Sequence, residues 1–141
     1  MMATLPMRTG AVRVSAIRIA ICGLIAATAL VHLTLGAMTS MMLATQPALV
    51  ASMGGATALG VMAALFYCNF AGYVVLGTAL YLPRLRGRQR VTRLALIGYT
   101  ALTVLAYFAL AQGHIDAFGL ADKACEALLI ALLAIEGRRA R

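Results

Sequence analysis

Residues 19–83 read IAICGLIAATALVHLTLGAMTSMMLATQPALVASMGGATALGVMAALFYCNFAGYVVLGTALYLP and contain no Asp, Glu, Lys or Arg. A helix needs about 20 residues to cross the hydrocarbon core of a membrane. Two crossings therefore fit within this stretch, and we place them at about residues 15–37 and 57–82. The connection between them contains Pro47 and the Gly54-Gly55 pair, which are typical of turns.

The composition of the whole chain agrees with a membrane protein. Of its 141 residues, 63% are hydrophobic and 11% are charged, whereas a soluble globular domain is about 45–50% apolar and about 25% charged. The net charge of +8 comes with no nucleic-acid-binding motif, so we predict no nucleic-acid partner. The three cysteines form no CxxC motif, and we therefore predict no metal site.

The C-terminal half supplies two further candidate spans. Residues 94–115 carry no charged side chain and form the third. The fourth runs over about residues 117–136, and its outer half carries Asp122, Lys123 and Glu126.

The distribution of arginine favours four crossings. The eleven arginines lie before the first span, between the second and third, and after the fourth. Since Lys and Arg near span ends stay on the cytoplasmic side, four crossings place all of them on that side. We therefore predict an all-α integral membrane protein, with four transmembrane helices in a bundle and both termini cytoplasmic. The expected location is the cytoplasmic (inner) membrane, and residues 1–141 form a single transmembrane domain with an uncleaved first span.

Two surfaces are predicted from residue pattern. The basic loop between the second and third spans is expected to contact anionic lipid headgroups through Arg84, Arg86, Arg88, Arg90 and Arg93. Small residues four apart in the second span allow another helix to approach closely, either from the same chain or from another subunit. This helix-packing face consists of Gly60, Ala64, Cys68 and Gly72.

Ionisable groups inside a span are costly, so each is a candidate for function. Approximate depths along the helices place one polar cluster near the middle of the membrane, formed by His32, Asn69, Asp122, Lys123 and Glu126. At 100° per residue the three span-four charges fall on one arc, which we expect to face the bundle. Deeply placed tyrosines in the second and third spans also need hydrogen-bond partners.

Three functional hypotheses follow. The first is a non-enzymatic accessory or scaffold subunit of a larger membrane complex, in which the cluster fixes helix register. The second is a homo-oligomeric small transporter, or an ion- or proton-coupled carrier, that uses His32, Asp122, Lys123 and Glu126. The third is a tetrapyrrole-binding subunit that holds haem at His32; His114 is the only other histidine, and its depth is poor for the same iron. No catalytic motif is present, so we predict no enzyme and no other cofactor.

Overall fold

The protein was analysed as a computed structural model that describes residues 9–110 and 116–139, with side chains described outside 9–15, 86 and 110. All secondary structure in these two ranges is helical, which confirms the all-α prediction. The elements are α1 (Thr9–Thr45), α2 (Pro47–Ser52), α3 (Gly55–Tyr81), the 3₁₀ helix η1 (Pro83–Arg88), α4 (Gln89–Leu110) and α5 (Ala117–Arg139).

Three of these helices are long and apolar enough to cross a membrane. Their apolar lengths are Ala16–Thr45 in α1, Gly55–Tyr81 in α3 and Gln89–Ala109 in α4. Lipid offers no partner for backbone polar groups, and a helix satisfies these groups internally. The three helices therefore indicate a membrane protein.

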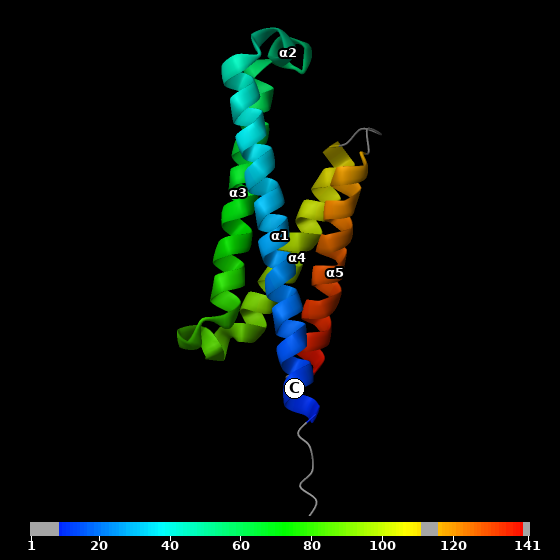
Figure 1. Cartoon of the computed structure of the whole chain (residues 1–141). Coiled ribbons are helices and arrows are strands. Elements are labelled where there is room, and N and C mark those ends of the chain that lie inside the picture. Colours follow the sequence, from blue (N-terminus) through cyan, green and yellow to red (C-terminus); the bar gives the residue numbers. More distant parts are fainter. Residues whose placement is uncertain (1–8, 111–115, 140–141) are drawn as a thin grey trace, which may run out of the picture.

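The four long helices run up and down in turn and form a bundle (Figure 1). The first residues of α1, the 3₁₀ helix η1 and the end of α5 lie at one end of this bundle, which we call the arginine-rich end. The hairpin of α1 and α3, with α2 at its tip, extends well beyond α4 and α5 at the other end. The bundle is therefore uneven in height.

Three predicted helix boundaries differ from the structure by five residues or more, and one of these is the start of α1, at Thr9 rather than near residue 15. α1 continues to Thr45 rather than ending near residue 37, because the extra residues contain neither Gly nor Pro, and Thr39 and Thr45 donate hydrogen bonds to carbonyls one turn earlier. α4 begins at Gln89 rather than at residue 94, since the arginines there continue the helix beyond the apolar run. The end of the predicted third span, residues 111–115, lies outside the described residues.

The turn between α2 and α3 relies on glycine. Gly54 and Gly55 have φ angles of +96° and +87°, a left-handed conformation that is costly for residues with a Cβ atom. This glycine pair reverses the chain, as the sequence predicted.

Between the cluster described below and the arginine-rich end, the bundle is filled by apolar side chains. The fully buried members of this core are Ile21, Leu80, Leu96, Leu129 and Leu133. They come from all four long helices and leave less than 2% of each side chain exposed. The helices are therefore held together here by close packing of aliphatic groups.

Glycine also permits the close approach of α1 and α3, although mainly at positions outside the predicted packing face. A Cβ atom on Gly77 would lie 2.7 Å from Cγ2 of Ile25, and one on Gly36 would lie 3.1 Å from the Tyr67 ring. Within the predicted face, Gly72 lies against Tyr99 of α4, whose hydroxyl also donates a hydrogen bond to the Cys68 carbonyl at 3.3 Å. Gly60 has open space beside it, and the side chains of Ala64 and Cys68 are exposed.

Candidate functional site: a charged cluster inside the bundle

Three charged side chains of α5 are buried in the bundle. Asp122, Lys123 and Glu126 expose 8%, 7% and 0% of their surface. The Lys123 ammonium donates to Glu126 Oε2 at 2.7 Å and lies 2.9 Å from Asp122 Oδ2. Their inward direction agrees with the arc predicted from helical periodicity. A single lysine therefore joins two carboxylates.

The carboxylate of Glu126 is held by groups from two further helices. The Tyr73 hydroxyl of α3 donates to Glu126 Oε1 at 2.9 Å. The same hydroxyl lies 3.1 Å from Thr103 Oγ1 of α4. Since hydrogen bonds to charged groups are about twice as strong as neutral ones, Tyr73 fixes the position of Glu126.

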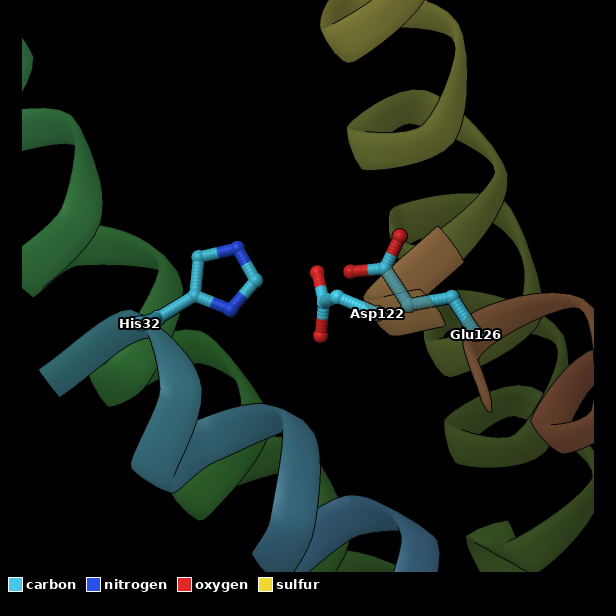
Figure 2. Close-up of side chains that lie close together, drawn as sticks. All are labelled: His32, Asp122 and Glu126. Atoms are coloured by element: carbon cyan, nitrogen blue, oxygen red, sulfur yellow. The ribbon is translucent and has the colours of Figure 1, made fainter. Parts of the chain in front are cut away.

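His32 approaches the cluster from α1. Its ring faces the carboxylates of Asp122 and Glu126 across the space between α1 and α5 (Figure 2). The Nδ1 atom lies 2.9 Å from the Thr28 carbonyl oxygen, which can only accept a hydrogen bond, so the proton of a neutral imidazole resides on Nδ1. Nε2 then carries the lone pair and is free to accept a proton.

The cluster carries an unbalanced charge. Two carboxylates and one ammonium sum to −1 while His32 is neutral. In addition, Asp122 Oδ1 is buried and has no hydrogen-bond partner among the described residues. A buried charge is costly unless it is paired, so the cluster as arranged lacks one unit of positive charge.

A small cavity lies beside the Asp122 side chain. Its volume is about 180 Å³, and its walls include His32, Asp122, Lys123, Tyr107 and Gly119. Asp116 and Phe118, at the start of α5, also line it, so the cavity lies on the side of the cluster away from the arginine-rich end. On the opposite side the apolar core closes the bundle.

The same residues offer atoms suited to a metal ion, but Lys123 competes for them. His32, Asp122 and Glu126 each place one potential ligand atom within 4.8 Å of the others. However, the Lys123 ammonium already bonds to both carboxylates. A metal ion would have to displace this ammonium group from both carboxylates. A proton would not, so the donor set favours a proton over a metal ion.

A second ionic group lies at the arginine-rich end. Arg93 of α4 donates from Nη2 and Nε to Glu136 Oε2 of α5, at 3.1 and 3.3 Å. Arg18 of α1 donates to the other oxygen of Glu136 at 3.1 Å. Glu136 is 5% exposed. This group therefore joins three helices around one carboxylate.

The remaining predicted residues are placed as follows. Asn69 does not join the cluster through any described contact; its side-chain oxygen accepts a hydrogen bond from Tyr99 at 2.9 Å. Arg84, Arg88 and Arg90 are exposed. The side chain of Arg86 and all of His114 lie outside the described residues.

Sequence reasoning missed the groups that complete both sites. Tyr73 and Thr103 are uncharged and lie on different helices, and the only signal was that a tyrosine deep in a span needs a partner. Glu136 was treated as the end of a span rather than as an ion-pair partner. Its spacing of two residues from Arg138 gave no indication that Arg93 and Arg18 would reach it.

Comparisons with known proteins add no further information on identity. No family model matches the chain, and neither a curated protein nor a solved structure matches it.

Proposed function

We propose that this protein is a proton-coupled carrier of the membrane, working as a homo-oligomer, with the Asp122–Lys123–Glu126–His32 cluster as its proton-binding site. The observation that carries the proposal is the buried Asp122 Oδ1 without a hydrogen-bond partner among the described residues, on a side chain that also lines a cavity. A proton on this oxygen or on His32 brings the cluster to electrical neutrality. Ionisable groups inside membrane helices commonly serve as proton relays.

A proton fits the site better than other cations do. Imidazole binds protons and transition metals, whereas alkali ions prefer oxygen ligands. A divalent ion would overcompensate the charge of −1 as long as Lys123 remains charged. The titratable groups around the cluster are Tyr73 of α3 and Tyr107 of α4, and Asp116 lines the neighbouring cavity, where its Oδ1 accepts a hydrogen bond from the Gly119 N–H.

The proposed topology makes α5 the fourth span. It has 23 residues, a length of about 35 Å, and it turns its charged groups inward rather than towards lipid. Both termini and η1 are then cytoplasmic, and the protein resides in the inner membrane. In this orientation the cavity lies on the side of the cluster away from the cytoplasm, and the apolar core separates the cluster from the cytoplasmic side. Carriers alternate between two such access states.

The test uses purified full-length protein in liposomes loaded with a pH-sensitive dye. An imposed membrane potential should drive proton movement through the wild type, and Glu126→Gln should reduce it to the rate of empty liposomes. Arg88→Gln, an exposed change outside the cluster, is the control and should retain the flux. If Glu126→Gln conducts protons as well as the wild type does, the cluster is not the proton site.

A second function, an accessory or scaffold subunit, is favoured by the outward face of α3. Gly60 has open space beside it and the side chains of Ala64 and Cys68 are exposed, and small residues are typical of close helix contacts in membranes. In that case purification in mild detergent should yield a defined complex with other membrane proteins. A homo-oligomer alone would instead support the carrier.

Haem at His32 is not favoured by the geometry. The cavity of about 180 Å³ beside His32 is smaller than the 300–1,000 Å³ typical of small-molecule pockets. The imidazole also faces two carboxylates (Figure 2). An absorption spectrum of the purified protein with a Soret band would overturn this view.

A further inference from the structure

A groove with three arginines lies between α4 and α5 at the arginine-rich end. Its volume is about 580 Å³. Arg90 and Arg93 line it from α4, and Arg138 lines it from α5. None of its described lining residues is acidic. The groove is therefore electropositive.

Two of these arginines are available to a ligand. Arg93 is committed to Glu136 through two hydrogen bonds. Arg90 and Arg138 are exposed, and neither forms an ion pair with any described residue. The groove therefore offers two free guanidinium groups, one from each wall.

Polarity changes along the groove in the direction of the helix axes. On α4, Arg90 is followed by Leu94 and Ile97, one and two turns further into the bundle. On α5, Ala134 lies one turn inward from Arg138. Seven residues of helix span about 10 Å, so the groove is basic at its outer end and apolar within this distance.

We propose that this groove is a binding site for a single anionic phospholipid, with its phosphate between Arg90 and Arg138 and an acyl chain along Leu94, Ile97 and Ala134. Guanidinium groups match phosphate oxygens geometrically. Basic pockets between transmembrane helices on the cytoplasmic side bind anionic headgroups. A phospholipid matches this change from basic to apolar, because its acyl chain can pack against the apolar residues of the groove. A free phosphate has no apolar group and does not match it. This site is independent of the proposed proton chemistry.

The structure also refines which arginines recognise lipid. Sequence reasoning grouped the arginines of the loop by position alone. Of the loop arginines, Arg90 lines the groove with a free guanidinium group, whereas Arg93 is paired with Glu136. Arg138, near the end of α5, lines the groove as well. Arg84 and Arg88 are exposed outside the groove, which makes them a matched control with the same change in charge.

The experiment is native mass spectrometry of the delipidated full-length protein in detergent, titrated with phosphatidylglycerol. The wild type should bind one lipid with higher affinity than any further lipid. Each arginine near an anionic headgroup contributes about fivefold to affinity, so Arg90→Gln/Arg138→Gln should weaken this first binding about 30-fold. Arg84→Gln/Arg88→Gln should change it by less than about twofold.

Two further arms identify the ligand and guard against misfolding. Inorganic phosphate and glycerophosphoglycerol, which lacks acyl chains, should not compete with the lipid; competition by either would show an anion site rather than a lipid site. Arg90→Lys/Arg138→Lys keeps the charge but loses the guanidinium geometry, and should bind the lipid more tightly than Arg90→Gln/Arg138→Gln and less tightly than the wild type. Equal weakening by the groove variant and the control variant would mean that binding is only a property of total charge, and would overturn the proposal.

Discussion

Replacing Lys123 by methionine tests whether the cluster is held by its central cation. The substitution removes the ammonium that lies 2.7 Å from Glu126 and 2.9 Å from Asp122. It leaves two buried carboxylates whose nearest potential ligand oxygens lie within 4.8 Å of each other. At an effective dielectric constant of about 20, two like charges at that distance repel by about 3.5 kcal/mol. The loss agrees with the range of about 3–5 kcal/mol for breaking a buried ion pair.

The free energy of unfolding would be measured by reversible titration with SDS, followed by circular dichroism. Lys123→Met should lower it by about 3–5 kcal/mol. Lys123→Met/Glu126→Gln restores the wild-type net charge and should recover about 2 kcal/mol or more of this loss, a coupling typical of residues in contact. Arg88→Met, an exposed change, should stay within about 0.5 kcal/mol of the wild type. The reasoning would be refuted if Lys123→Met were as stable as the control, or if its cost were the same with and without Glu126→Gln.

Four further substitutions are expected to change the same unfolding free energy in distinguishable ways. Tyr73→Phe removes a hydrogen bond to a buried carboxylate and should cost about 1.5–3 kcal/mol; no loss would mean that this hydroxyl does not position the cluster. Glu136→Ala leaves the guanidinium of Arg93 buried without its partner and should cost about 3 kcal/mol. An unchanged free energy of unfolding would show that water solvates the Arg93 guanidinium when Glu136 is absent. Gly72→Ala forces a methyl group into a neighbouring tyrosine and should destabilise by about 1–3 kcal/mol. Gly60→Ala meets open space and should stabilise by about 0.5–1 kcal/mol, so equal effects of the two glycine changes would contradict the packing described.

The sequence predicted those parts of the charged cluster that depend only on helical periodicity. Asp122, Lys123 and Glu126 share one face of a helix, and burial in lipid is costly enough to turn that face inward. His32 joined them because its depth along α1 matched theirs. Both inferences depend only on residue spacing and rise per residue, which hold for any α-helix.

The rest of the site depended on how helices pack, which spacing does not encode. Tyr73 reaches Glu126, and Thr103 reaches Tyr73, because α3, α4 and α5 lie close together at that level. Asn69 has a similar depth but turns towards Tyr99. The end of α1 was misplaced because an apolar helix can continue beyond the membrane-crossing length without any local signal. Rotation of each helix about its axis and its angle to neighbours are properties of the whole bundle.

The uneven height of the bundle has a consequence for the surrounding bilayer. The apolar stretch of α1 spans 30 residues and that of α4 spans 21, which correspond to lengths of about 45 and about 32 Å. A hydrocarbon core of about 30 Å matches α4 closely and leaves α1 too long by about 15 Å. Leaning by about 40°, the steepest usual tilt, would still leave α1 about 4 Å in excess. An over-long apolar stretch is accommodated by tilting, by kinking or by local thickening of the bilayer, so we expect the bilayer to be deeper around the α1–α3 hairpin than around α4 and α5.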